Sequence, residues 1–309
     1  MPPFRYAAFC RQVKRRAFAA RSRTVCLSVV TPLLVFIIFP TSLCAEPDPR
    51  RAELNPKTSE AFATYVKATD TRNSTELQRG AELLWIDSLP EAAQKKAYDA
   101  LGRGEVEMEQ RHTLINGKEA PCPDGLIHHW EGLIFVPGAK VSDVLRILQD
   151  YNHHSEYYAP DVARSKIESR DGDRFQVFMR FRRQKVVTVV LDTTHDITYY
   201  RDSPTLAHSR STATHIAEVD NPDKPNEKEK SHYDDNGFMW GMETWWRFEE
   251  KDGGVYVQGE VVSLTREIPV GLGWMIGPFV TSIPKSSLTF TLEATKKAVL
   301  AQLGSANPK

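Results

Sequence analysis

Between Gly125 and Leu303, the apolar and polar positions follow one order of elements. Alternation over residues 127–136 predicts a strand, and an amphipathic stretch over residues 141–158 predicts short helical segments. A series of strand patterns follows without any helical period between them. A single closing helix is then expected from about Pro284 to Leu303, because its core-facing residues form a continuous stripe: Leu288, Leu292, Thr295, Val299 and Leu303.

The strand patterns after residue 170 alternate or are rich in β-branched and aromatic residues, and they cover residues 175–183, 186–200, 206–219, 239–250 and 255–266. The Asp-Gly-Asp and Asp-Gly-Gly sequences at 171–173 and 252–254 predict hairpin turns, and residues 201–204 a third connection. Residues 220–236 are polar and contain two prolines, so they predict a long solvated loop. This order predicts an α+β fold in which a curved antiparallel sheet wraps around a long C-terminal helix and leaves a cavity between the two.

Residues 58–120 precede this domain and have weaker patterns. Residues 58–72 carry apolar side chains at helical spacing after a Thr-Ser cap, and Pro90 opens a second helix over residues 91–101. Residues 105–115 alternate as a strand, and Asn116-Gly117 is a strong turn signal. Neither helix has enough apolar surface to be stable alone. We therefore expect a helical extension that packs on the outside of the main domain.

The first 45 residues have the order of an export signal. A basic segment without acids is followed by an apolar run over residues 25–39 and by small residues up to Ala45. This order predicts a cleaved signal peptide over residues 1–45 and a periplasmic or secreted protein. The alternative is an uncleaved segment that anchors the chain to the inner membrane. Residues 46–57 then form a flexible leader, and residues 304–309 a disordered tail.

Loss of this segment changes the charge and the cysteine count. It holds seven of the 40 basic residues and none of the 40 acidic ones, so the rest of the chain has a formal charge of −7. An acidic protein has no electrostatic reason to bind nucleic acid. Of the four cysteines, only Cys122 remains, which rules out an internal disulfide in the mature chain.

Candidate catalytic and metal-binding residues are weak in this sequence. The pair His128-His129 lies on a strand and points to opposite faces, so the two cannot hold one ion together. The pair His153-His154 lacks acids or cysteines at ligand spacing, and solvated histidines are the favoured interpretation. No nucleophile motif is present, and nothing calls for a cofactor. The glycine-rich apolar stretch 271–279 favours a flexible hydrophobic gate over a phosphate loop.

Charged residues also occur inside the predicted strands, namely Arg180, Arg182, Glu243, Arg247 and Glu260. The two-residue period of a strand places Glu243 and Arg247 on one face and Met242 and Trp246 on the other. The favoured interpretation is that the charges lie on a solvated face of the sheet. The alternative is that one of them faces the cavity and orients a ligand head group.

Residues 150–162, DYNHHSEYYAPDV, follow the amphipathic helix and precede a strand. In this position they resemble the helical segment of the START-like (SRPBCC) superfamily, and most closely its coenzyme-Q-binding and polyketide-cyclase branch. The resemblance covers about residues 125–303 and rests on the order of elements. It implies the helix-grip fold and a hydrophobic ligand, sometimes with lipid-transfer or cyclase activity.

These observations favour an exported protein that binds a lipid, quinone or polyketide-like molecule as carrier or sensor. The alternatives are a cyclase, dehydratase or hydrolase acting on such a molecule in the same cavity, and a protein whose cavity is filled by its own side chains. Transient membrane contact and the oligomeric state stay open. The residues expected to bind the ligand are Tyr157, Tyr158, Val177, Met179, Phe181, Trp240, Met242, Trp246, Phe248, Trp274, Phe279, Leu288 and Leu292.

Overall fold

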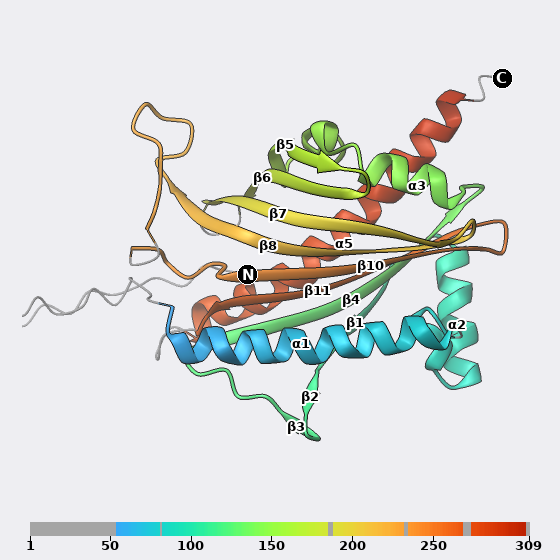
Figure 1. Ribbon diagram of the computed structural model, residues 1–309, viewed down its shortest axis with the longest axis horizontal. Coiled ribbons are helices and arrows are strands. Elements are labelled where there is room, and N and C mark those ends of the chain that lie inside the picture. The colour runs from blue at the N-terminus through green and yellow to red at the C-terminus, as the bar shows by residue number, and fades with distance from the viewer. Residues whose placement is uncertain (1–53, 81, 185–187, 232–233, 268–272, 307–309) are drawn as a thin grey trace, which may run out of the picture. The chain divides into compact units, whose positions relative to one another are not determined.

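The main element is an antiparallel sheet of nine strands (Figure 1). Its strands follow the order β1-β4-β11-β10-β8-β7-β6-β5, and the short β9 pairs with β8 outside this path. Their bounds are β1 Glu107–Gln110, β4 Gly125–Pro137, β5 Val162–Asp171, β6 Arg174–Gln184, β7 Thr188–Ser203, β8 Leu206–Asp220, β9 Lys228–Glu229, β10 Gly241–Lys251 and β11 Gly254–Arg266.

The computed structural model describes residues 54–80, 82–184, 188–231, 234–267 and 273–306, with side chains in the last segment from residue 282 to 305. These residues belong to one unit of the chain, which spans Pro47–Lys309. The predicted signal peptide, most of the leader and the last three residues of the predicted tail lie outside the described residues.

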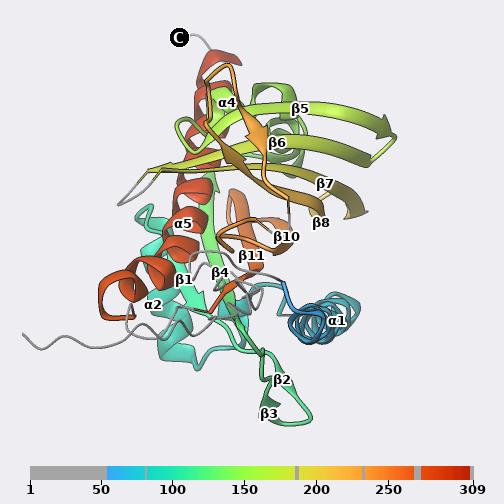
Figure 2. The same ribbon diagram turned by 90° about the vertical axis from the view of Figure 1, so that its left-hand side faces the viewer.

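The C-terminal helix α5, Gly273–Ala306, crosses one face of the sheet (Figure 2). We call this the inner face. The helix begins well before Pro284, so residues 273–278, expected as irregular, are helical and the prediction was wrong there. Contact is closest at Gly132 of β4, where an added Cβ would come within 2.6 Å of Leu292 and 2.7 Å of Met108. Glycine at this point lets the helix lie directly on the sheet.

Short helical segments cover one end of the inner face. They are α3 Val141–Leu148, the 3₁₀ turn η2 Tyr151–His153, and α4 His154–Tyr157. The buried side of α3 includes Val144, Leu145 and Leu148, which pack with α5 and the inner face in the main hydrophobic core. The predicted α+β helix-grip architecture is therefore confirmed.

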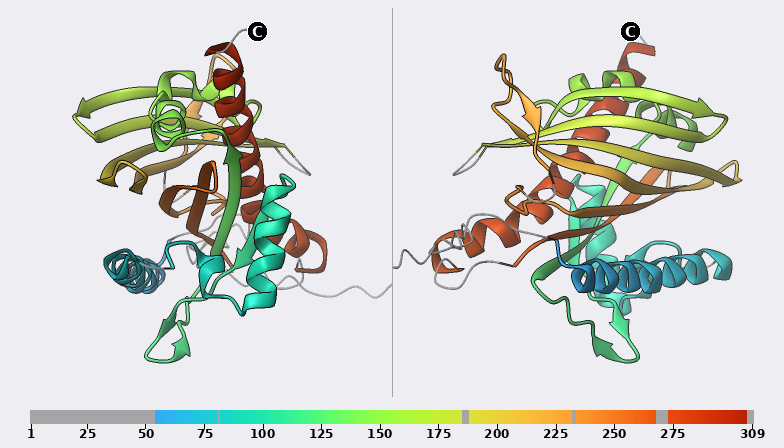
Figure 3. Two further views of the ribbon diagram at one scale, coloured as in Figure 1. Left: turned by 90° about the vertical axis from the view of Figure 1, so that its right-hand side faces the viewer. Right: turned by 60° about the vertical axis from the view of Figure 1, so that its left-hand side comes forward.

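Helix α1, Pro56–Arg79, lies across the opposite, outer face of the sheet (Figures 1 and 3). It is longer than predicted and is capped by the side chain of Asn55, which accepts from the amide of Lys57 at 2.9 Å. The expected cap, Thr58, is buried instead and donates to the carbonyl of Pro123 at 2.6 Å. Tyr65 of α1 packs with Trp245 and Val262 of the sheet.

The rest of the N-terminal extension also packs on the sheet. The 3₁₀ turn η1, Trp85–Ser88, and helix α2, Glu91–Gly102, form a second cluster with Leu133 and Tyr256. The predicted strand 105–115 is two pieces: β1 joins the main sheet beside β4, and β2 Leu114–Ile115 pairs with β3 Lys118–Glu119. The predicted turn at Asn116-Gly117 is confirmed, with φ of 53° and 76°.

Candidate functional site

A cavity of about 360 Å³ lies between the inner face of the sheet and α5. Its walls come from β6, β7, β8, β10 and β11, from η2 and α4, and from the segment of α5 between Ile283 and Thr291. The volume falls within the range of small-molecule sites, and most of the wall is apolar.

Six of the thirteen residues expected to bind the ligand line this cavity: Tyr158, Met179, Phe181, Met242, Trp246 and Leu288. Tyr158 directly follows α4, and the others come from β6, β10 and α5. The strand residues among them share the inner face, as the two-residue period predicted. That they bind a ligand stays a prediction.

Five other expected residues lie elsewhere. Val177, Phe248 and Leu292 are fully buried in the main core, because α3 fills the inner face at that end of the sheet. Tyr157 donates to Asp150 at 2.8 Å, and the indole of Trp240 donates to Asp235, so neither is part of the wall. The side chains of the remaining two, Trp274 and Phe279, lie outside the described residues. The expected gate, residues 271–279, is described only as the helical backbone of α5 from Gly273 onward, and its side chains lie outside the described residues.

The wall also contains polar residues that the sequence analysis did not select. His195 of β7, Ser209 and Ser211 of β8, Thr244 of β10 and Ser263 of β11 are all buried and line the cavity. The two-residue period could have found them, since they share faces with residues such as Ile197 and Trp246. Serine and threonine inside strands are common on solvated faces, and so they gave no signal of their own.

Two tyrosines close the deep end of the cavity. The hydroxyls of Tyr151 and Tyr199 lie 2.7 Å apart, and Tyr199 also donates to the carbonyl of Leu148. Burial raises the pKa of both phenols, so they stay protonated. They offer neutral hydrogen-bonding groups at the point where the cavity meets the packed core.

The opposite end of the cavity carries its charged residues. Arg183, next to the last residue of β6, pairs with Asp161 at 2.7 Å and donates to Ser287 of α5 at 2.6 Å. Arg266, the last residue of β11, lies at the same end of the sheet, and Phe238 beside it is 41% exposed. The cavity therefore reaches the surface at this end.

The charged strand residues lie on the outer face and not in the cavity. The favoured expectation, a solvated face, is wrong for four of the five, because other parts of the chain bury them. The alternative, a charge from this set that faces the cavity, is not observed among these five residues. Arg180 forms two hydrogen bonds of 2.6 Å with Asp192 and pairs with Glu227 at 2.9 Å. The loop that carries Glu227 was expected to be solvated, but here it covers the sheet. Arg182 pairs with Asp223 of the same loop.

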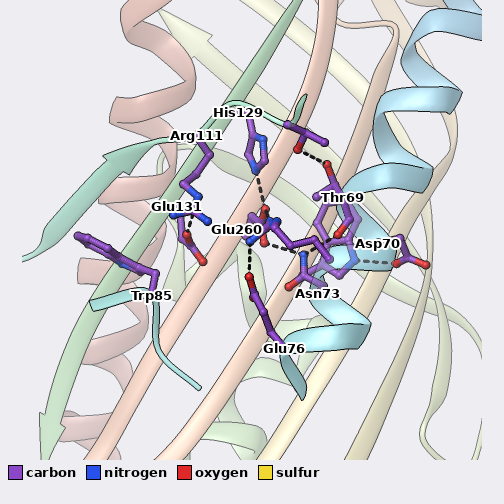
Figure 4. A network of polar contacts seen from close by, with 12 residues as sticks. Thr69, Asp70, Asn73, Glu76, Trp85, Arg111, His129, Glu131 and Glu260 are labelled. Atoms are coloured by element: carbon purple, nitrogen blue, oxygen red, sulfur yellow. Dashed lines mark hydrogen bonds and ion pairs between the residues drawn. The ribbon is translucent and has the colours of Figure 1, made fainter. Parts of the chain in front are cut away.

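A buried polar network joins α1 to the sheet (Figure 4). Arg247 of β10 donates to the carbonyl of Leu83 at 2.7 Å and to Asn73 of α1 at 2.6 Å, and it also pairs with Glu76. Asn73 in turn donates to Glu260 of β11 at 2.8 Å. These contacts satisfy charges that the helix removes from water.

Glu260 is also held by His129 and Arg72. The amide of Thr113 donates to the hydroxyl of Tyr65, which lies 2.9 Å from Nδ1 of His129. Burial lowers the pKa of His129, so the ring is neutral, with Nδ1 as acceptor and Nε2 donating to Glu260. His128 and His129 are both buried, and so is His154, which was expected to be solvated.

Glu131 of β4 lies directly opposite Glu260 of β11 in the sheet register. Both are 1% exposed. Burial, together with the charge of Glu260, raises the pKa of Glu131 to about 8. Burial acts in the same direction on Glu260, but the hydrogen bond from His129 and the charge of Arg72 outweigh it and lower that pKa to about 2. Near neutral pH the pair therefore carries a single negative charge.

Comparison with known proteins finds solved structures of similar fold but no matching sequence family. No family model and no curated protein sequence matches the chain. A STAR-related lipid transfer protein from Xanthomonas axonopodis is similar in structure, with 16% identity, a TM-score of 0.39, and coverage of 58% of this chain and 95% of that one.

Two further solved structures are similar over most of their length. The aromatase/cyclase Zhui from Streptomyces sp. R1128 has 12% identity and a TM-score of 0.39, and the match covers 59% of this chain and 99% of that one. Human STARD10 has 10% identity and a TM-score of 0.41, with 71% and 84% covered.

Among the described helices, none combines the length and the apolar character needed to cross a membrane.

Proposed function

We propose that this chain is an exported protein that binds a hydrophobic small molecule, such as a lipid, a quinone or a polyketide-like compound, in the cavity under α5. It acts as a carrier or sensor. The observation that supports this is the cavity itself, about 360 Å³ of mostly apolar volume inside an otherwise packed domain. Each methylene moved from water into such a site contributes about 0.8 kcal/mol, so a chain of several carbons binds without an ionic anchor.

The surroundings of His195 favour binding over catalysis. An enzyme of the cyclase or hydrolase type would need an acid–base pair within reach of one ligand atom. The ring nitrogens of His195 face the hydroxyls of Thr193 and Ser211, at 3.0 and 3.5 Å. Neither contact joins His195 to a carboxylate, and burial lowers the pKa of His195 to about 4, so its ring is a weak base at neutral pH.

Exchange of the ligand would take place at the end of the cavity near Phe238. An exposed aromatic side chain beside an apolar opening suits brief contact with a membrane or another apolar donor. This route, like the export of the chain, is part of the proposal.

The test is uptake of an apolar fluorescent probe, 1-aminoanthracene, by the purified protein, together with mass spectrometry of the molecules that co-purify with it. Met179→Lys places a charge in the cavity and should weaken probe binding at least tenfold, because an unpaired ammonium cannot stay buried there.

Phe178→Lys is the matched control. Phe178 is the next residue of the same strand, is also half-buried, and lies on the opposite face against Lys166. Binding by this variant should equal that of the wild type. No uptake by the wild type at micromolar concentration, with no co-purifying molecule, would rule out the proposed function.

A further inference from the structure

Five polar residues form a band across the middle of the cavity wall, and we call them the hydroxyl patch: His195, Ser209, Ser211, Thr244 and Ser263. They are at most 7% exposed. In the sheet register Ser211 lies directly opposite Thr244, and the neighbouring pairs are Ser209 with Trp246 and Ser263 with Met242. The patch is thus continuous across β7, β8, β10 and β11, with apolar wall around it.

The direction of the hydrogen bonds at one side of the patch can be assigned. The hydroxyl of Thr193 donates to the carbonyl of Met179 at 2.9 Å, so its oxygen accepts from Nε2–H of His195 at 3.0 Å. Burial lowers the pKa of His195 to about 4, which leaves the ring neutral and Nδ1 as an acceptor. The hydroxyl of Ser211, 3.5 Å away, donates to Nδ1. The lone pairs of Ser211 Oγ are then available for a hydrogen-bond donor inside the cavity.

The other three hydroxyls of the patch can donate a hydrogen bond to a ligand, whereas Ser211 can accept one. Among the described residues, the side chains of Ser209, Thr244 and Ser263 have no hydrogen-bond partner, although all three are buried. Their hydroxyl oxygens are reachable from the cavity, so either water or a ligand group inside it can be their partner. A hydroxyl proton is free to rotate toward an acceptor, and these three groups can donate to a ligand oxygen.

The arginine side chains of the cavity wall lie at a distance from the hydroxyl patch. The arginines in the described part of the wall, Arg183 and Arg266, are at strand ends, whereas the patch spans the strand middles. Arg183 is already paired with Asp161. A carboxylate held at the patch would meet only neutral groups, and a buried charge without a counter-charge is costly.

We propose that the hydroxyl patch recognises an uncharged hydroxyl group of an otherwise apolar ligand: Ser211 accepts its proton and Thr244, its cross-strand neighbour, donates to its oxygen. The ligand class is therefore a hydrophobic alcohol and not a fatty acid. This inference rests on the proposed function, because it names the chemistry that the same cavity selects.

The experiment is displacement of bound 1-aminoanthracene by four twelve-carbon compounds at pH 7.5: 1-dodecanol, 2-dodecanone, dodecanoate and dodecane. The alcohol should compete about tenfold better than the hydrocarbon, as expected for net gains of one or two hydrogen bonds. The ketone should fall between them, because it can accept from Thr244 but cannot donate to Ser211. The carboxylate should be the weakest polar competitor.

Variants then test the assignment of the donor and the acceptor. Ser211→Ala should remove most of the preference for the alcohol over the hydrocarbon, with each competitor measured against the 1-aminoanthracene affinity of that same variant, whereas Ser211→Thr keeps a hydroxyl and should retain the preference. His195→Phe frees the proton of Ser211 and should shift the preference from the alcohol toward the ketone. Thr214→Ala removes an exposed hydroxyl from the same strand and should have no effect.

The outcomes separate this inference from the proposed function. If the wild type does not bind 1-aminoanthracene, both fail. If the probe binds but the alcohol competes no better than the hydrocarbon, or dodecanoate competes best, only the inference is overturned. Loss of probe binding in every variant of Ser211 would also overturn it, since the patch would then be part of the packing and not of recognition.

Discussion

Two glutamates, Glu131 and Glu260, lie opposite each other in the sheet and are both buried. Like charges in directly opposed positions destabilise a strand pair, and here both are removed from water. The conflict is reduced because the two carboxyls have different partners. Glu260 accepts from His129 and Asn73, whereas Glu131 accepts from Gln258 at 2.7 Å and lies 3.3 Å from Arg111.

This arrangement predicts that stability falls as the pH rises from about 4.5 to about 8. The pKa of Glu131 is raised in the folded state, so between about pH 4.5 and 8 the folded protein holds a proton that the unfolded chain has released. The stabilising contribution is complete below the unfolded pKa and is lost as the pH passes the folded one. Urea unfolding from pH 5 to 9 should show a decline approaching 1.4 kcal/mol per pH unit at its steepest.

Glu131→Gln should remove this decline, because the amide stays neutral at every pH and keeps an oxygen for Gln258. Above pH 8 the variant should be at least as stable as the wild type. Glu109→Gln is a suitable control, since Glu109 is exposed and pairs with Glu131 in the register of β1 and β4. An unchanged pH profile in Glu131→Gln would show that Glu131 is not the group that titrates.

For single residues, the sequence predicted which face of a strand each side chain occupies, but it did not predict which other parts of the chain bury that face. The two-residue period correctly separated Met242 and Trp246 from Glu243 and Arg247. It could not reveal that a helix almost 200 residues away in the sequence covers the charged face. For that reason the charges that are buried here were expected to be solvated. The polar residues of the cavity wall were not predicted, because aromatic and aliphatic side chains were selected instead.

Among the elements, α1 is attached to the sheet in an unusual way. Its apolar contacts are limited to a small cluster around Tyr65, and much of the rest of the interface is charge and amide. Such an interface has strict geometry, because every group in it has lost its water and depends on a specific partner.

Arg247→Ala should therefore destabilise the protein by about 3–5 kcal/mol, the usual cost of removing one partner from a buried ionic network. It leaves the carbonyl of Leu83 and the amide oxygen of Asn73 without their donor, and the carboxylate of Glu76 with Arg72 as its remaining partner. Hydrogen exchange should report the loss first in the amides of α1, ahead of those of β7 and β8.

Lys95→Ala provides the comparison. Lys95 pairs with Asp99 on the exposed side of α2, and an exposed pair of this kind adds little to stability because water and salt screen it. If Arg247→Ala is equally mild, or if α1 exchanges no faster than the central strands, the network does not hold the helix in place.

The elements themselves were predictable where side chains alternate. The strands that became β4, β6, β7, β8, β10 and β11 were found within a few residues of their ends. The start of α5 was placed too late, because glycines and Pro278 lowered the local helix propensity, which is only a weak guide when a long helix packs on a sheet. Strand β5 was missed because its residues are mostly polar.

For the molecule as a whole, the open question of greatest consequence is its location. The basic and apolar order of residues 1–45 predicts cleavage near Ala45 or Glu46. Intact-mass analysis of the protein expressed with its own N-terminus should find a chain that begins there. A fusion to alkaline phosphatase after residue 60 should be active, because that enzyme requires the oxidising environment outside the cytoplasm.

Replacing Leu33 and Leu34 by arginine interrupts the apolar run and should leave the chain at full length and the fusion inactive. A wild-type protein that retains residues 1–40 in a soluble form would contradict the proposed export. Retention of the same residues in a membrane fraction would support the anchored alternative.

Strand β5 has a further consequence, for behaviour in concentrated solution. It forms one border of the sheet, where unpaired backbone groups could recruit a strand from another molecule. Arg164, Lys166, Glu168 and Arg170 project along this border, and its register is interrupted twice. The same polarity that concealed the strand from a search for apolar patterns makes it a poor template for fibre growth. Many copies of this protein can therefore be present in a crowded compartment without pairing edge to edge through β5.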